Sequence, residues 1–265
     1  MTTTEWTTEK VADILLDAEA SRTDRGRITD EWPDLDLETG YAAQRVLIER
    51  KKADGHTVVG VKLGLTSRAK QQRMGIDSPL TAVITDKMVL EAGVPIALDE
   101  LIHPRVEPEI VFVLGERLQG PGVTAASAMR AVASVHAGLE VIDSRYRDFS
   151  FAMPDVVADN ASSARFIVGA TSVSPIGLDL ALEACVLRIN GVVVDTATGA
   201  AVQGHPAEAL ALAANALAAR GEAIEAGSIV LTGGMTDAVF INDGDEVSVE
   251  FTSLGQITAP VRRSA

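Results

Sequence analysis

Three carboxylates lie inside two of the most apolar segments of this 265-residue chain, and they constrain its fold more than any other feature. Glu107 and Glu109 belong to the apolar segment 106–114, and Glu140 follows Leu139 in the apolar segment 135–143. Both segments have the composition of buried strands, in which an ionised carboxylate is costly unless a positive group meets it. A fold that buries these strands is therefore expected to bring a cation to the carboxylates, and a divalent metal ion can serve all three.

The charge balance argues against several classes of partner. Lys and Arg total 23 against 37 Asp and Glu, which gives a formal net charge of −14. Such a surface repels phosphate backbones and anionic membranes, so neither nucleic acid nor a membrane is an expected partner. We find no secretory signal at the N-terminus and no apolar run approaching the ~18 residues of a membrane helix, and we predict a cytoplasmic protein. The single cysteine, Cys185, is predicted to be a buried structural thiol.

Hydrophobic residues make up 47% of the chain, enough for one large domain or for a core with a smaller appendage. Apolar spacing predicts two helices within residues 7–55, separated by a loop at 31–34. Strands are predicted at 58–65, 106–114 and 135–143, with an Ala-rich helix at 125–133 and an ordered loop at 144–157 over a site. Thr66 or Ser67 can cap a short helix that Gly75 would end.

The C-terminal half shows the pattern of short strands. Asn190 and Gly191 predict a type I′ hairpin, and Pro206 predicts the first turn of a helix that reaches about Arg220. Further strands are expected near 228–232, 238–242, 245–252 and 257–262. The strands have mixed spacing and few crossover helices, which argues against a doubly wound parallel sheet. The prediction is an α+β fold with a rolled, antiparallel or mixed β core that carries helices.

Spacing along a strand places Glu107 and Glu109 on one face, because side chains at i and i+2 point the same way. Their Cα atoms would be about 6.5–7 Å apart, so both could reach one ion, and Glu140 could supply a third ligand from another strand. Hard oxygen ligands favour Mg²⁺ or Mn²⁺ over zinc. The alternative is that these glutamates form the solvent face of an edge strand, where Pro108 would be tolerated.

Other polar residues in apolar surroundings are candidates for the site. Lys62 is flanked by apolar residues and glycines, so it could transfer protons or hold a carboxylate substrate, unless it reaches solvent from a strand edge. Asp159 and Ser162 could bind a substrate carboxylate or a water with Arg145 as counter-charge, or simply form a turn. Thr232 and Gly233 follow a strand, where backbone N–H groups can approach an anion, although a plain tight turn explains them equally well.

Several motifs in this order resemble the hydratase/decarboxylase family of the meta-cleavage pathway for aromatic breakdown, within the fumarylacetoacetate hydrolase superfamily. The resemblance covers nearly the whole chain. It is carried by 60–67 (GVKLGLTS), 103–110 (HPRVEPEI), 139–146 (LEVIDSRY), 157–163 (VADNASS), 204–206 (GHP) and 231–234 (LTGG).

This resemblance implies a rolled mixed β-sheet core at 56–265 that binds metal and carries catalysis, with a helical region at 1–55. It implies Mg²⁺ or Mn²⁺ at the residues matching Glu107, Glu109 and Glu140, and a catalytic role for Lys62. It also implies a small dicarboxylate substrate, a homo-oligomer and a complex with the pathway hydratase.

The family divides into vinylpyruvate-type hydratases and 4-oxalocrotonate decarboxylases, and two stretches resemble the decarboxylases. Hydratases typically carry Asp-aromatic-Gly after the lysine motif, whereas the matching stretch 78–82 has Leu80 in place of that Asp. The segment 144–151 also resembles the decarboxylase loop. Thr81 and Ala82 depart from the aromatic-Gly pair usual in decarboxylases, so the shape of the pocket can differ.

A decarboxylase reading gives roles to the remaining candidates. Leu80 would keep water and a repelling carboxylate away from the departing group, and Arg145 would hold the distal carboxylate loosely. Lys62 and the cation would stabilise charge on the 2-oxo oxygen. The alternatives are a hydratase of the same fold, acting on 2-hydroxypenta-2,4-dienoate, and a non-catalytic partner subunit of that hydratase.

Overall fold

The computed structural model describes residues 5–67, 71–72 and 79–263. Its α-helices are α1 (Thr8–Ser21), α2 (Ile28–Glu31), α3 (Leu37–Ala53), α5 (Ala125–Ala131), α6 (Met153–Ala158) and α7 (Pro206–Ala218). Its strands are β1 (Val58–Gly64), β2 (Leu80–Thr85), β3 (Ile96–Ala97), β4 (Arg105–Leu114), β5 (Val132–Ile142), β6 (Ser163–Val168), β7 (Ala184–Ile189), β8 (Val192–Thr198), β9 (Ile229–Leu231), β10 (Val239–Phe240), β11 (Glu246–Phe251) and β12 (Gly255–Arg262).

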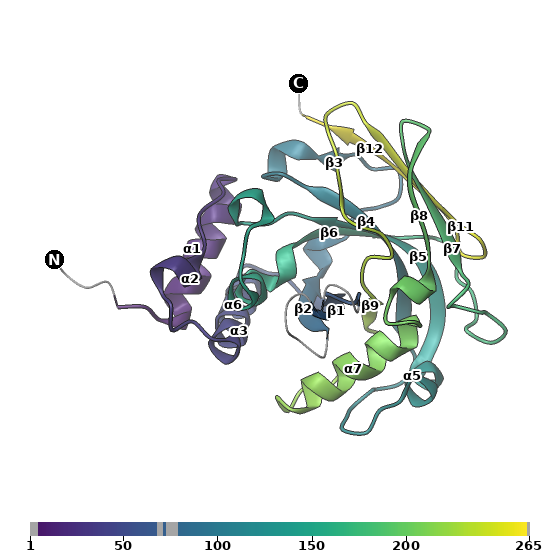
Figure 1. The fold of residues 1–265 in the computed structure, drawn as a ribbon, viewed down its shortest axis with the longest axis horizontal. Helices are drawn as coiled ribbons and strands as arrows, with labels where there is room; N and C mark the ends of the chain where they lie inside the picture. The colour runs from purple at the N-terminus through teal and green to yellow at the C-terminus, as the bar shows by residue number, and fades with distance from the viewer. Residues whose placement is uncertain (1–4, 68–70, 73–78, 264–265) are drawn as a thin grey trace.

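The strands form two sheets. The larger has the order β2-β1-β9-β4-β5-β6, with β10 also paired to β4, and the smaller has the order β3-β12-β11-β7-β8. Pairing is antiparallel except between β1 and β9 and between β12 and β3. Figure 1 shows that the larger sheet is strongly curled. The predicted rolled, mixed β core is confirmed, and the curl lets residues on β1 approach residues on β5.

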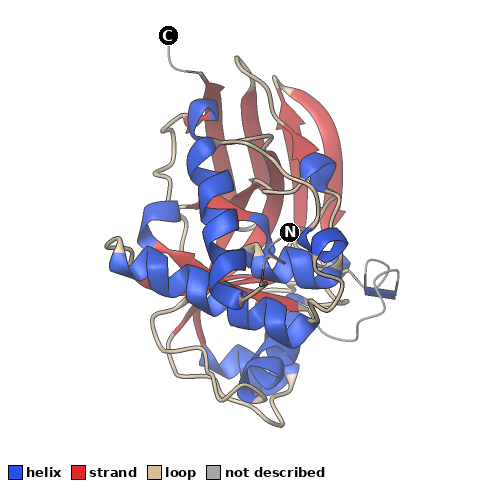
Figure 2. Cartoon of the chain, turned by 90° about the vertical axis from the view of Figure 1, so that its left-hand side faces the viewer, coloured by secondary structure: helices blue, strands red, loops and turns tan. Residues whose placement is uncertain are grey.

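Helices cover the sheets in two groups (Figures 1 and 2). The N-terminal helices α1, α2 and α3 gather with α6 on one side, where a cluster of buried apolar residues joins the helices to Tyr146 and Ala158. Helix α7 packs against α5, and its buried Ala and Leu residues belong to the largest core cluster, which they share with both sheets. No helix in the described ranges combines the length and the apolar character that a membrane crossing requires.

Most predicted elements are present. Asp36 caps α3, and His205 caps α7 with Pro206 in its first turn. Asn190 and Gly191 both have positive φ between β7 and β8, as the predicted type I′ turn requires. The segment 144–157 differs from the predicted loop, because α6 begins within it at Met153. The predicted helix end at Gly75, and Ser78 of the compared stretch, lie outside the described residues.

Candidate active site

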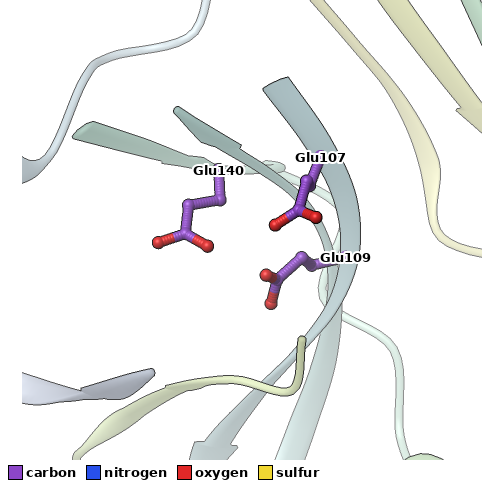
Figure 3. A group of neighbouring side chains, drawn as sticks. All are labelled: Glu107, Glu109 and Glu140. Atoms are coloured by element: carbon purple, nitrogen blue, oxygen red, sulfur yellow. The ribbon is translucent and has the colours of Figure 1, made fainter. Parts of the chain in front are cut away.

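Strand register brings the three predicted metal ligands together. In the antiparallel pair of β4 and β5, Glu107 lies opposite Glu140 and Glu109 lies opposite Gly138, so all three glutamates share one face. One oxygen from each carboxylate lies within 4.8 Å of the others, and Figure 3 shows the carboxylates converging. Glu109 is 0% exposed and Glu140 1%, and Glu107 is partly buried. The alternative of a solvent-exposed edge strand is wrong.

Pro108 is tolerated in this interior strand because no described strand pairs with β4 at that residue on the side opposite β5. Strand β10 pairs with β4 at Arg105 and Val106, and β9 pairs with it at 111–113. Between these two ladders the Pro108 carbonyl accepts from the Met235 amide at 2.9 Å. The nitrogen of Pro108 faces the same side, so its missing N–H leaves no ladder bond unmade.

The carboxylates carry more negative charge than their surroundings balance. Burial, then Glu140 and Glu107, raise the pKa of Glu109 well above its usual value, while the Gly233 amide opposes the rise. Glu109 Oε1 and Glu140 Oε2 are buried and find no hydrogen-bond donor in the described part of the chain. Lys62 pairs with Glu140, and a divalent cation between the three carboxylates would offset their mutual repulsion. Orphaned hard oxygens of this kind fit Mg²⁺ or Mn²⁺.

Lys62 lies on β1, and the curl of the sheet brings it to Glu140 on β5. Its Nζ is 2.8 Å from Glu140 Oε1 and donates to the Ala161 carbonyl at 2.7 Å. The side chain is only 4% exposed, so the alternative of a lysine that reaches solvent from a strand edge is wrong. An ammonium fixed by two acceptors has one N–H left to donate to a ligand.

The turn that holds Ala161 has a costly backbone conformation. Asn160, Ala161 and Ser162 have φ values of 49°, 51° and 57°, in the left-handed region that non-glycine residues rarely adopt. The Asn160 side chain accepts from the Val83 amide at 2.9 Å and donates to the Val83 carbonyl at 2.8 Å. These bonds fix the turn on β2, so that Ala161 faces Lys62 and Ser162 lines the cavity.

Arg145 and Asp159 support this turn from behind and do not line the cavity. The Arg145 guanidinium is ion-paired with the Asp159 carboxylate and donates at 2.6 Å to the carbonyls of Asp143 and Asp159. Both side chains are buried. Burial raises the pKa of Asp159 to about 6, although Arg145 opposes the rise. The sequence suggested Arg145 as a counter-charge for a substrate carboxylate. In the structure its donors are bound to Asp159 and to backbone carbonyls, outside the cavity.

Thr232 and Gly233 form hydrogen bonds within the protein, to β4. The Thr232 hydroxyl donates to the Ile110 carbonyl at 2.7 Å, and the Gly233 amide donates to Glu109 Oε2 at 2.8 Å. Gly233 has a φ of +105°, and a Cβ on Gly234 would lie 2.7 Å from Glu107 Cδ. The two glycines thus let the backbone approach the glutamates closely. The predicted anion contact is therefore made to a glutamate side chain of this protein.

Lys62 and Glu107 line a cavity of about 410 Å³. Leu80, which is 3% exposed, contributes to an apolar wall together with Ile142, Phe149 and Phe151. Arg105 also lines the cavity, and sequence reasoning missed it as a site residue. The two-residue period of a strand could have predicted this position, because Arg105 lies two residues before Glu107 and therefore on the same strand face. Burial lowers the pKa of Arg105, and the charge of Glu107 opposes this shift.

Comparison with known proteins identifies the family. The model of the fumarylacetoacetate (FAA) hydrolase C-terminal family matches residues 57–262. The chain belongs to the fumarylacetoacetate hydrolase family.

Within this family the chain is similar to both decarboxylases and hydratases. It is 41% identical over 249 residues to a 4-oxalocrotonate decarboxylase of Pseudomonas sp. (strain CF600), covering 94% of each chain. It is 37% identical to a 2-hydroxyhexa-2,4-dienoate hydratase of Comamonas testosteroni, covering 86% of this chain and 87% of the relative. The solved 4-oxalocrotonate decarboxylase from Pseudomonas putida G7, complexed with magnesium and adipate, superimposes with a TM-score of 0.93 at 39% identity, covering 96% and 97% of the two chains.

Proposed function

We propose that this chain is a Mg²⁺- or Mn²⁺-dependent decarboxylase that converts 4-oxalocrotonate (2-oxohex-3-enedioate) to 2-hydroxypenta-2,4-dienoate and CO₂. The reaction would serve the meta-cleavage degradation of aromatic compounds. The observation that carries the proposal is the convergence of three carboxylates at a cavity that Lys62, Glu107 and apolar side chains line. The end-to-end similarity to 4-oxalocrotonate decarboxylases supports the choice of substrate.

Glu107, Glu109 and Glu140 would hold the metal ion. When bound, the ion supplies a Lewis acid for the 2-oxo oxygen of the substrate. As the bond to the distal carboxylate breaks, its electron pair moves through the enone towards that oxygen. Lys62 is fixed by Ala161 and Glu140 and keeps a donor for the growing negative charge. This interaction strengthens towards the transition state, which is the condition for catalysis.

Leu80 would decide between loss of CO₂ and addition of water. Its buried side chain lines the cavity where hydratases of the family typically carry an aspartate. An apolar group there neither activates water nor repels the departing carboxylate. Ser162 lines the same cavity, and we propose it as a substrate contact. Asp159, Thr232 and Gly233 would support the site through the protein contacts that they make.

A hydratase of the same fold is the second candidate, favoured by the relatives with that name. One assay separates the two. The protein is incubated with Mg²⁺ and 4-oxalocrotonate to follow CO₂ release, and separately with Mg²⁺ and 2-hydroxypenta-2,4-dienoate to follow hydration. Release of CO₂ supports the decarboxylase. Hydration of 2-hydroxypenta-2,4-dienoate without CO₂ release would favour the hydratase, and neither reaction would favour a non-catalytic partner subunit.

We further propose that the protein works in the cytoplasm as a homo-oligomer and associates with the pathway hydratase. The exposed apolar side chains of Val192, Val193 and Val194 on the edge strand β8 are a candidate contact surface. Light scattering of the protein alone, and then mixed with the hydratase, tests both associations. A monomer that stays separate from the hydratase would contradict them.

A further inference from the structure

Arg105 is a cation in the cavity that the reaction described above does not use. It begins β4, two residues before Glu107, and lies opposite Ile142 of β5, which also lines the cavity. The same two-residue period that aligns Glu107 with Glu109 therefore continues to Arg105. One strand face thus carries a guanidinium at one end and two of the candidate metal ligands at the other.

Two aromatic rings contact this guanidinium. The Arg105 Cζ lies 4.2 Å from the ring centroid of Phe149 and 4.0 Å from that of Phe240. The two rings meet edge to face at 83°, and Phe149 also contacts His103. Because the two rings are nearly perpendicular, the guanidinium can stack face to face on only one of them, and the other ring meets its edge. Arg105 Nε is buried, and none of the described residues accepts a hydrogen bond from it.

We propose that Arg105 binds the distal carboxylate of the substrate and makes the site prefer dicarboxylates to monocarboxylates. The inference rests on the proposed function and names the residue that selects its substrate class. A planar guanidinium can bind a carboxylate in a two-bond arrangement, and the Nε–H of Arg105, unpaired within the described ranges, is one of the donors for it. Arg145 cannot take this role, since its donors are bound to Asp159 and to backbone carbonyls.

The spacing along β4 agrees with a six-carbon diacid. Two residues of strand rise separate Arg105 from Glu107 by about 6.6 Å. A six-carbon chain has five carbon–carbon bonds of about 1.5 Å, which in zigzag span roughly 6 Å between the terminal carbons. The two lengths are similar, and both Arg105 and Glu107 line the cavity, so a substrate held at the glutamates by its 2-oxo acid end could extend its far carboxylate towards Arg105. Arg105 is partly buried and Phe240 is 53% exposed, so selection would rest on the two-bond geometry of the guanidinium and carboxylate.

The test compares two ligands that differ only in the distal carboxylate. Binding of 2-oxoadipate and 2-oxohexanoate to the full-length, Mg²⁺-loaded protein is measured by calorimetry. The variants are Arg105→Met, Arg105→Lys and, as a matched control, Arg117→Met, which removes an exposed arginine paired with Glu225. We expect the wild type and Arg117→Met to bind 2-oxoadipate about 10- to 100-fold more tightly than 2-oxohexanoate.

Arg105→Met should reduce this ratio to below about threefold while its affinity for 2-oxohexanoate stays unchanged, and Arg105→Lys should keep part of the ratio. Unchanged 2-oxohexanoate binding also demonstrates a folded, metal-loaded variant. The proposal is overturned if the wild type shows no preference, if Arg105→Met keeps it, or if both ligands weaken equally. Should Arg105→Met fail to fold, a ratio in Arg105→Lys equal to that of the wild type would overturn it.

The kinetic consequence separates this proposal from the proposed reaction. With 4-oxalocrotonate, Arg105→Met should raise KM about 10- to 100-fold without lowering kcat, because the contact holds a ground-state charge that is lost as CO₂ leaves. If the wild type releases no CO₂ but the binding ratio behaves as expected, the proposed reaction fails and the subsite stands. If CO₂ is released but the ratio survives in Arg105→Met, the subsite alone fails.

Discussion

Two buried charge clusters lie on either side of the turn 160–162, and they differ in how their charges are satisfied. Arg145 and Asp159 neutralise each other, and backbone carbonyls accept the remaining donors of the arginine. In the glutamate cluster, Lys62 pairs with Glu140, but one oxygen of Glu109 and one of Glu140 have no donor among the residues that the structure describes. Burial alone therefore does not mark a functional site. The excess charge and the orphaned oxygens do so.

The two clusters depend on each other through the turn. The Arg145 pair fixes Asp159, and the turn that follows it presents the Ala161 carbonyl to Lys62. The internally balanced cluster thus supports the strained backbone that positions the unbalanced one. Variants should separate these roles, because one cluster would govern metal binding and turnover while the other governs stability.

The largest effect is expected in the unbalanced cluster. Glu140→Gln removes one proposed ligand and the partner of Lys62, so kcat/KM should fall by about 10³ or more. The measurement is CO₂ release after chelator treatment and readdition of Mg²⁺ or Mn²⁺. Glu107→Gln should behave in the same direction. Full turnover of the wild type after the chelator has removed all divalent ions would contradict a metal-dependent role for the glutamates.

Lys62→Met should separate charge stabilisation in the reaction from metal binding. The variant loses the donor for the developing oxygen charge, so kcat should fall by about 10²–10³ while the fold remains. Mn²⁺ should bind at least as tightly as in the wild type, because a nearby positive charge is gone. Steady-state kinetics and a Mn²⁺ titration measure the two effects. A normal kcat would remove Lys62 from the mechanism.

Arg145→Met tests the balanced cluster. It leaves the Asp159 carboxylate buried without its partner, so the free energy of unfolding should fall by about 3–5 kcal/mol. Adding Asp159→Asn should recover part of this loss, because the uncompensated charge is removed as well. Denaturant unfolding measures both variants. Mn²⁺ affinity should stay within about threefold of the wild type. A loss as large as that in Glu140→Gln would show that the Arg145 cluster also governs metal binding.

The smallest expected effect is a dependence of stability on pH. The pKa of Asp159 is about 6 in the folded protein, because burial raises it, and is near 4 in an unfolded chain. Between these values the folded protein binds the proton more tightly, so this contribution to stability falls as pH rises from about 4 to 6 and is constant above. The Tm of the wild type relative to Arg145→Met/Asp159→Asn should drop by a few degrees across that range. A flat difference would contradict the shift.

Local pattern was sufficient for much of the fold and for the chemistry of the three glutamates. The two-residue period aligned Glu107 with Glu109, and the turn residues Asn190 and Gly191 located a hairpin. The pairing of Glu107 with Glu140 could not be derived in this way, because strand register depends on contacts between distant segments. Helix α6 was missed because a helix of six residues gives too little apolar periodicity to detect.

The candidate substrate contacts were harder to predict than the candidate metal ligands. Arg145 and Arg105 both stand beside candidate ligands in the sequence, and only the fold shows that one is bound to Asp159 and the other lines the cavity. Lys62 presented the same difficulty, because burial and access to solvent fit its flanking residues equally well. The placement of each of these three side chains depends on which strand or turn the fold brings next to it.

The central claim is that Glu107, Glu109 and Glu140 together hold one divalent cation. The most direct measurement is a Mn²⁺ titration of chelator-treated protein, followed by electron paramagnetic resonance, on the wild type, Glu140→Gln and Arg145→Met. The account predicts one bound ion per chain in the wild type and in Arg145→Met, and a loss of affinity of at least about a hundredfold in Glu140→Gln. Equal binding by Glu140→Gln and the wild type would contradict it.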